Sequence, residues 1–231
     1  ELARSMDERK ELILEIIIKE HIKTGAPVGS GVVVEKYNLE VSPATVRNDM
    51  SWLEHEGFIA QPHTSAGRIP TEGAYQWFLN RVKTGKLKDI SKSDIRSLIK
   101  DKKEEDLKQV AKALAQHSNN AIFWAFNPRN LYYTGISNLF AQPEFAQIEK
   151  VYDLSVVIDR MDEVIEDVFR NYDQGIHTII GADNPFGAFC STVLCKYKST
   201  DGYSMFGVIG PMRMDYAKNI SLVNLVNKEL S

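Results

Sequence analysis

The stretch that most constrains the fold of this chain runs from Val41 to Thr71, because it marks both ends of a short helix and continues into a predicted hairpin. Ser42 is a natural N-cap, and Pro43 follows it at the first helical position, where a missing N–H costs nothing. Gly57 follows the last residue of the helical pattern and suits a left-handed C-terminal cap. The spacing therefore predicts a helix that begins at Pro43 and ends just before Gly57.

This predicted helix has one apolar and one polar face. Val46, Met50 and Leu53 recur at helical spacing and are expected to face the core. Most of the residues left to face solvent lie toward the N-terminal end: Ser42, Ala44, Thr45, Arg47, Asn48 and Ser51. Arg can bond guanine bidentately, Asn can do the same with adenine, and Ala or Thr can contact a thymine methyl group. The exposed face therefore fits a helix that reads the DNA major groove.

The sequence after this helix predicts a two-stranded wing. Phe58–Gln61 forms the first predicted strand, and Arg68–Pro70 returns alongside it. The tip between them carries hydroxyl groups and a glycine, which can approach a phosphate backbone closely. The wing residues predicted to contact DNA are His63, Thr64, Ser65 and Arg68.

Two other interpretations of this stretch stay open. It also fits an ordinary structural unit with a solvated face, or a winged domain that binds another protein. A protein-binding surface would favour an aromatic or aliphatic anchor where Arg47 and Asn48 stand. Residues 1–83 contain 10 Lys and Arg against 12 Asp and Glu, and the whole chain has a net charge of −3. Bulk charge therefore argues against a strong non-specific DNA binder, and affinity must depend on local groove contacts and on two copies.

The segments around this stretch complete the order of a winged helix-turn-helix domain. Helices are predicted over Asp7–Thr24 and Val28–Asn38, before the Ser42-capped helix, and a fourth helix opens at Thr71 after the wing. Three helices followed by a hairpin is the order of that motif. We assign residues 6–83 to this domain and the polar, lysine-rich residues 84–103 to a linker.

The remaining residues, 104–231, predict a mixed α+β domain with an antiparallel sheet. Its predicted helices are Glu104–Ser118, Val151–Tyr172 and Lys218–Leu230, and its predicted strands are Ala121–Phe126, Ile176–Gly181, Phe189–Lys198 and Tyr203–Gly210. We assign this domain to regulation and dimerisation.

The N-terminal segment resembles the DNA-binding domain of the HrcA heat-inducible transcription repressors, through PVGS at Pro27–Ser30, S-x-ATVRNDM from Ser42 and QPHTSAGRIPT from Gln61. YYTGISNLFAQPEF, TIIGADNP and GVIGPMRMDY resemble motifs later in the same family. The resemblance implies a homodimeric repressor that binds an inverted-repeat operator in double-stranded DNA upstream of chaperone genes and is released on heat stress. It also implies a GAF-like C-terminal domain and a GroE-type chaperonin as a partner.

The chain departs from the family pattern in one respect. The resemblance implies a further inserted domain used for dimerisation, but only Asn127–Asn130 separate Phe126 from Leu131. We therefore expect a shortened member without that domain, whose dimer contact is carried by the Val151–Tyr172 helix or the exposed part of the last helix. Because GAF-like domains often bind small ligands, a ligand-responsive transcriptional regulator is the alternative function.

Residues that could support other functions lack a recognised motif. His177, Asp183 and Cys190 can be drawn as a triad, but no nucleophile elbow or P-loop accompanies them. The histidines lack zinc-site spacing, and Cys190 and Cys195 are too few for a disulfide scaffold. We therefore expect no enzyme activity, no catalytic or metal site and no cofactor. The sequence contains neither an apolar run of membrane-helix length nor a signal-peptide pattern, which predicts a cytoplasmic protein with no membrane partner.

Overall fold

The computed structural model describes residues 6–64, 66–82, 87, 92–200 and 202–231, and its contacts divide the chain into two compact units after Val82. The stretch predicted as a linker, 84–103, contains helix α5 (Lys92–Leu98), whose Ile95 is buried in the second unit. Residues 84–86 and 88–91 lie outside the described part of the chain. The domain limits 6–83, 84–103 and 104–231 stay predictions.

The first unit begins with three helices: α1 (Glu8–Thr24), α2 (Ser30–Tyr37) and α3 (Pro43–His55). The caps explain where α1 begins and ends. The Asp7 carboxylate accepts a hydrogen bond from the Lys10 N–H at 2.9 Å, and Gly25 ends the helix at a φ of 68°. The apolar faces of the three helices meet in a common core, in which Ile13, Ile17, Val33, Val46 and Leu53 are fully buried.

A short hairpin follows, with β1 (Ile59–Ala60) and β2 (Ile69–Pro70) antiparallel, and α4 (Glu72–Leu79) closes the unit. A third strand segment joins the hairpin, because Val28 and Arg68 exchange backbone hydrogen bonds of 2.8 and 2.9 Å. The connection between α1 and α2 is therefore paired with the wing. The predicted winged helix-turn-helix arrangement is confirmed.

Two buried carboxylates tie these helices together, and the apolar pattern of the sequence did not identify either. Asp49 on α3 accepts hydrogen bonds from the Arg9 guanidinium on α1. Glu20 on α1 pairs with Lys36 and accepts a 2.9 Å hydrogen bond from the Tyr37 hydroxyl. Buried charges of this kind are stable only when they are paired, so both pairs fix how the helices pack.

The second unit contains helices on both sides of one sheet. After α5 its elements are α6 (Glu104–Ser118), β3 (Ala121–Asn127), β4 (Asn130–Thr134), α7 (Ile136–Phe140), α8 (Ile148–Asp159), α9 (Met161–Asn171), β5 (Gly175–Ile180), β6 (Cys190–Ser199), β7 (Gly202–Pro211) and α10 (Tyr216–Leu230), with short 3₁₀ turns at Pro143–Ala146 and Gly181–Asp183.

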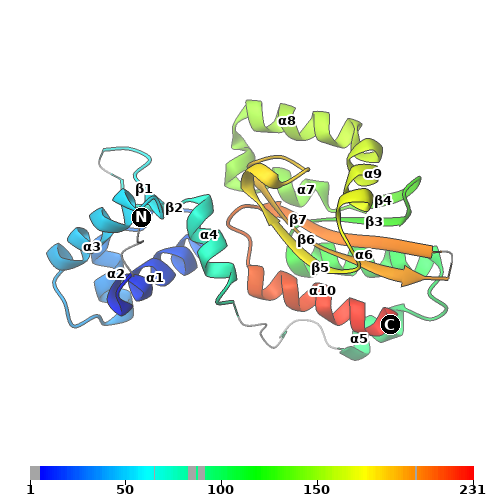
Figure 1. The fold of residues 1–231 in the computed structure, drawn as a ribbon, viewed down its shortest axis with the longest axis horizontal. Helices are drawn as coiled ribbons and strands as arrows, with labels where there is room; N and C mark the ends of the chain where they lie inside the picture. The colour runs from blue at the N-terminus through cyan, green and yellow to red at the C-terminus, as the bar shows by residue number, and fades with distance from the viewer. Residues whose placement is uncertain (1–5, 65, 83–86, 88–91, 201) are drawn as a thin grey trace. The chain divides into compact units, whose positions relative to one another are not determined.

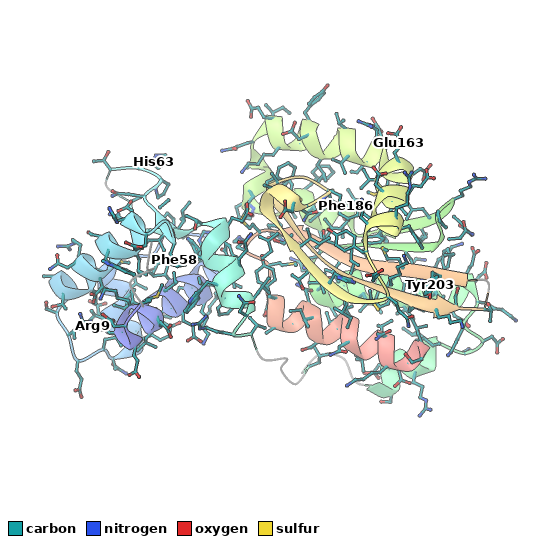
Figure 2. The ribbon with its side chains drawn as sticks, in the orientation of Figure 1. Arg9, Phe58, His63, Glu163, Phe186 and Tyr203 are labelled. Atoms are coloured by element: carbon teal, nitrogen blue, oxygen red, sulfur yellow. The ribbon has the colours of Figure 1, made fainter. Side chains whose placement is uncertain are left out.

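The five strands are all antiparallel and are ordered β4-β3-β7-β6-β5. Helices α7, α8 and α9 cover one face of the sheet, while α6 and α10 cover the other (Figure 1). On the first face Phe123 packs on Phe186, which Figure 2 labels, with ring centroids 5.3 Å apart. On the second face the buried Trp124 indole donates to the Tyr197 hydroxyl at 3.0 Å. The predicted α+β class with an antiparallel sheet is confirmed.

The helix predicted over Val151–Tyr172 was wrong in one respect, because the structure contains two helices there. The chain breaks at Arg160, where φ is −108° and ψ is 21°. The break lets each helix set its own face toward the sheet: α8 buries Leu154, while α9 buries Ile165 and Val168. Periodicity gave no sign of this change of direction, since both segments are amphipathic.

Every helix in the described residues is too short or too polar to span a lipid bilayer.

Candidate nucleic-acid interface

The N-terminal end of α3 is fixed by its cap. The Ser42 hydroxyl accepts a hydrogen bond from the Thr45 N–H at 3.1 Å, and Pro43 occupies the first helical position. The Thr45 hydroxyl lies 3.0 Å from the Ser42 hydroxyl, so both side chains are held at the start of the helix. This local chemistry sets the direction in which the next residues of α3 point.

The predicted groove-reading residues share the exposed side of α3. Ala44, Arg47, Asn48 and Ser51 are exposed, and Thr45 is half-buried. The Ser51 hydroxyl donates to the Arg47 carbonyl oxygen at 3.0 Å, so it is already engaged with the helix backbone. Within the described residues, the Arg47 guanidinium has no hydrogen-bond or ion-pair partner. The structure therefore brings a free guanidinium, an amide and a methyl group together on one solvent-facing helix surface.

The wing tip is held by backbone and amide hydrogen bonds. The Ala66 N–H donates to the His63 carbonyl at 2.9 Å, and the Gln61 amide donates to the carbonyls of Thr64 and Ala66 at 2.9 and 3.1 Å. His63 and Thr64 are exposed, and Figure 2 labels His63 at the outer end of this loop. Ser65, also predicted to contact DNA, lies outside the described residues.

Arg68 is placed differently from the other predicted wing residues. Its side chain is only 16% exposed, and two of its guanidinium nitrogens lie 3.0 and 2.9 Å from the same Glu54 carboxylate oxygen. The structure therefore joins Arg68 to α3, whereas the sequence pattern had suggested a contact with phosphate.

A cleft of about 370 Å³ brings these elements together. It lies among the start of α2, the exposed side of α3 and the wing, and it is lined by Val28, Gly29, Ser30, Arg47, Met50, Gln61, Thr64, Ala66, Gly67 and Arg68. Hydroxyl groups and guanidinium groups from three separate segments thus converge on one surface. Such groups are the usual donors to phosphate oxygens and base edges.

Sequence reasoning missed three residues that shape this surface, Ser30, Glu54 and Gln61, and it did not identify the steric role of Gly67. For Gly67 the requirement is steric, because a Cβ atom there would lie 2.4 Å from the Val28 carbonyl carbon. The PVGS segment contains Gly29 and the SAGR segment contains Gly67, but the sequence does not show that these two segments of the chain cross each other closely. The available signal was the pair of turn residues, Gly29 and Gly67, flanking predicted elements.

The second unit offers little chemistry. Burial raises the pKa of both the Cys190 and the Cys195 thiols to about 12, so neither supplies a thiolate at neutral pH. The His177 ring lies 2.9 Å from the Asp173 carbonyl oxygen, a contact within its own strand and loop. No group of three His, Cys, Asp or Glu side chains in the described ranges is arranged to hold a metal ion.

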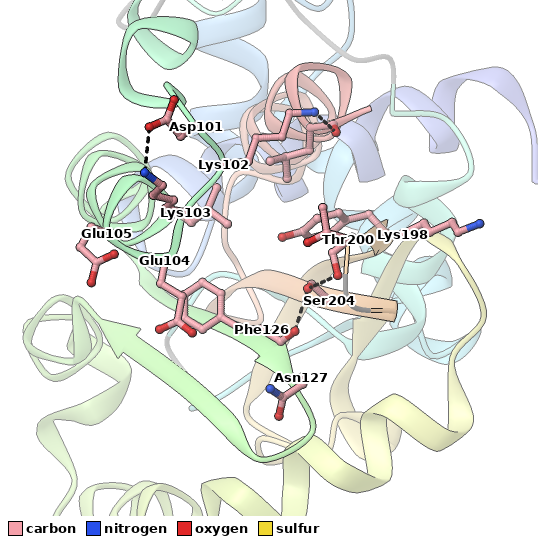
Figure 3. A pocket seen from close by; sticks show the side chains of 14 residues that line it. Asp101, Lys102, Lys103, Glu104, Glu105, Phe126, Asn127, Lys198, Thr200 and Ser204 are labelled. Carbon is pink, nitrogen blue, oxygen red and sulfur yellow. Dashed lines mark hydrogen bonds and ion pairs between the residues drawn. The ribbon is translucent and has the colours of Figure 1, made fainter.

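The second unit also has an open pocket of about 620 Å³ at the start of α6 (Figure 3). Several of its charged groups already have partners in the protein: Lys103 pairs with Asp101 at 3.1 Å, and Lys102 donates to the Leu230 carbonyl oxygen at 2.6 Å. The lining mixes lysines and carboxylates without a dominant sign, so it does not specify a ligand class.

Comparisons of the sequence with family models and with known proteins agree on one family. A family model described as the HrcA protein C terminal domain matches residues 72–220. The heat-inducible transcription repressor HrcA of Carboxydothermus hydrogenoformans is 26% identical over 333 aligned positions, spanning 98% of this chain and 97% of that protein. HrcA of Acidothermus cellulolyticus is 50% identical over 93 residues, which are 40% of this chain and 27% of that protein.

A solved structure shows the same fold. The crystal structure of a hypothetical protein at 2.2 Å resolution superimposes with a TM-score of 0.80 at 19% identity, over 98% of both chains. The alignment to the Carboxydothermus protein has 333 positions while this chain has 231 residues, so about a hundred positions have no counterpart here. This difference agrees with the expectation of a shortened member. Because the family model matches more than half of its residues, the chain belongs to the HrcA family, whose curated members are named heat-inducible transcription repressors.

Proposed function

We propose that this protein represses transcription by binding an inverted-repeat operator in double-stranded DNA upstream of chaperone genes, and that heat stress releases it. The observation that carries the proposal is the exposed side of α3, where Arg47 has no partner among the described residues and lies beside Asn48 and Ala44. A capped helix with these side chains on its exposed face fits the recognition helix of a winged domain. Because the proposed target is an operator in DNA, we propose that the protein acts in the cytoplasm.

The groups on this surface divide into two kinds of contact. Arg47, Asn48, Ala44 and Thr45 carry side chains that read base edges in the major groove. Ser42, Ser51, His63, Thr64 and Ser65 supply hydroxyl and imidazole groups suited to phosphate oxygens, which position the domain without reading sequence.

An inverted repeat requires two copies of the domain related by a two-fold axis. We place the contact between copies on α8, where Ile148 is 74% exposed, Tyr152 69% and Val156 39%. These residues are four apart, so an antiparallel copy centred on Tyr152 sets Ile148 against Val156. These three side chains form an apolar stripe along α8. The surface area of this stripe is much smaller than the ~800 Å² that each partner buries in a stable interface. We therefore expect a weak dimer that is stabilised when both copies bind the two half-sites of the operator.

Charge gives this contact a testable property. The exposed carboxylates of Glu149 and Asp153 lie beside the stripe, and in this arrangement both would come close to the Asp153 carboxylate of the second copy. Salt screens such repulsion, so self-association measured by sedimentation should strengthen between low and moderate salt. The Tyr152→Glu variant should abolish it, and an unchanged association constant in that variant would exclude α8.

We assign heat control to the second unit as part of this proposal. We propose that this unit is marginally stable and that a GroE-type chaperonin keeps it in the form that binds the operator. Asn219 supports the first part of this proposal. Its side chain is buried, and neither of its amide atoms has a hydrogen-bond partner within the described residues. An unpaired buried amide lowers stability by about 1–3 kcal/mol.

The deciding experiment compares binding of the purified chain to a chaperone-operon inverted repeat and to a scrambled duplex at two salt concentrations. A preference of about 10³-fold or more for the repeat is expected of a specific binder. Equal affinity for both duplexes, with steep salt dependence, would leave only electrostatic binding and would reject the proposal.

A further inference from the structure

Arg68 is held in place through both its backbone and its side chain. Its backbone N–H and C=O pair with Val28, at 2.9 and 2.8 Å, in the connection between α1 and α2. Its guanidinium pairs with Glu54 on α3, at 3.0 Å from Nε and 2.9 Å from Nη2. This residue therefore joins the wing to two other parts of the unit.

Glu54 explains why a cation is needed at this position. It lies in the last turn of α3, which ends at His55, so its carboxylate faces the negative end of the helix dipole. An arginine brought in from the wing offsets that unfavourable interaction. The Glu54 side chain is 35% exposed and that of Arg68 is 16% exposed, so the pair is partly shielded from water.

Arg47 provides the contrast. It is exposed on the same cleft and has no partner in the described part of the chain, whereas Arg68 lines the cleft with its charge already neutralised. Two arginines on one surface thus occupy different electrostatic states. The free one is available to DNA, and the paired one fixes the direction in which the wing leaves α3.

We propose that Glu54 and Arg68 form a positioning pair that sets the angle of the wing against the recognition helix, and that Arg68 does not contact phosphate. The proposal rests on the function proposed above. It assigns to Glu54, an acidic residue, a favourable role in binding a polyanion. It also predicts that removing the charge of Glu54 and removing the charge of Arg68 weaken operator binding by a similar factor.

The test uses Glu54→Met and Arg68→Met, which remove each charge and keep an unbranched apolar side chain, close in length to Glu and to the aliphatic part of Arg. Both variants should bind the operator less tightly by a similar factor, about fivefold or more, within the range for contacting charged residues. If Arg68 instead contacts phosphate, Arg68→Met weakens binding while Glu54→Met leaves it unchanged or strengthens it. That divergence would overturn the proposal.

The dependence of affinity on salt gives a second readout. A lost phosphate contact lowers the slope of log K against log salt by about 0.9. We expect unchanged slopes in both variants, and a decrease of about 0.9 in Arg68→Met would reject a positioning role. The matched control is Glu15→Met, which breaks the exposed Lys19–Glu15 pair on α1 and should leave operator binding unchanged.

Exchanging the two charges separates positioning from damage to the wing. The double variant Glu54→Arg/Arg68→Glu restores an ion pair, so it should bind the operator more tightly than either Met variant. If the double variant binds as weakly as the Met variants do, the proposal is contradicted. A wild-type chain without operator preference would reject the proposed function instead. In that case a double-mutant cycle on the stability of the first unit would still show whether residues 54 and 68 are coupled.

Discussion

Asp49 and Arg9 form an ion pair with two hydrogen bonds that ties the middle of α3 to α1. The Arg9 Nε lies 2.8 Å from Asp49 Oδ2, and Nη2 lies 3.1 Å from Oδ1. The Asp49 side chain is 7% exposed, whereas that of Arg9 is 48% exposed, so the buried member is the carboxylate. The pair sits on the opposite side of α3 from Arg47, where it fixes how that helix is presented.

The first prediction follows from this asymmetry. Asp49→Ala removes a buried acceptor of charge-assisted hydrogen bonds and should lower the free energy of unfolding by about 1–3 kcal/mol. Urea denaturation followed by circular dichroism measures this change. Glu15→Ala, which removes the exposed i,i+4 pair with Lys19, should change it by less than about 0.5 kcal/mol. Equal effects of the two substitutions would show that burial of Asp49 contributes nothing.

The second prediction concerns the acid limit of stability. The hydrogen bond with Lys36, followed by that from Tyr37, holds the pKa of Glu20 below its ordinary value of 4.5, although burial opposes them. A depressed folded-state pKa means that the stabilisation is complete above about pH 4.5 and is lost as the pH falls through the folded-state value. Glu20→Gln should therefore flatten the loss of unfolding free energy below pH 4.5. If the unfolding free energy of Glu20→Gln falls with pH as steeply as that of the wild type below pH 4.5, Glu20 does not cause this loss of stability.

The sequence predicted the local features well and the contacts between elements poorly. The cap at Ser42, the apolar face of α3 and the order of helices and wing follow from residue type and spacing, and all of them are present. The pairs Arg9–Asp49 and Glu54–Arg68 join residues 40 and 14 positions apart, and no local pattern encodes them. The break at Arg160 was missed for the same reason, since tertiary packing and not periodicity decides it.

The third prediction tests the recognition role proposed for α3. Arg47→Ala should weaken operator binding by about 1–3 kcal/mol and relax the preference for the repeat over a scrambled duplex, because a base-edge contact discriminates between sequences. Fluorescence anisotropy with both duplexes measures the two effects together. Lys23→Ala, an exposed change in the last turn of α1, serves as the control. An equal loss on both duplexes in Arg47→Ala would identify a phosphate contact.

The fourth prediction compares two glycines of the first unit. Gly67→Ala places a Cβ atom 2.4 Å from the Val28 carbonyl carbon and 2.5 Å from its oxygen, so the wing must move away from Val28. We expect lower stability and weaker operator binding. Gly31→Ala, on α2, meets no atom within 4 Å and should instead stabilise the fold by about 0.4–1 kcal/mol. Thermal unfolding of both variants checks the opposite signs, and a stabilised Gly67→Ala would show that the wing does not cross Val28 closely.

The fifth prediction links the stability of the second unit to heat release. Asn219 on α10 is 1% exposed, and its amide nitrogen and oxygen have no hydrogen-bond partner in the described ranges. Leu has nearly the shape of Asn and needs no partner, so Asn219→Leu should raise the free energy of unfolding by about 1–3 kcal/mol. For a chain of this size that is a rise in Tm of roughly 2–4 °C per kcal/mol. The temperature at which the operator is released should rise with it, since the second unit is proposed to set that temperature. A higher Tm with an unchanged release temperature would place the thermal control in the winged domain instead.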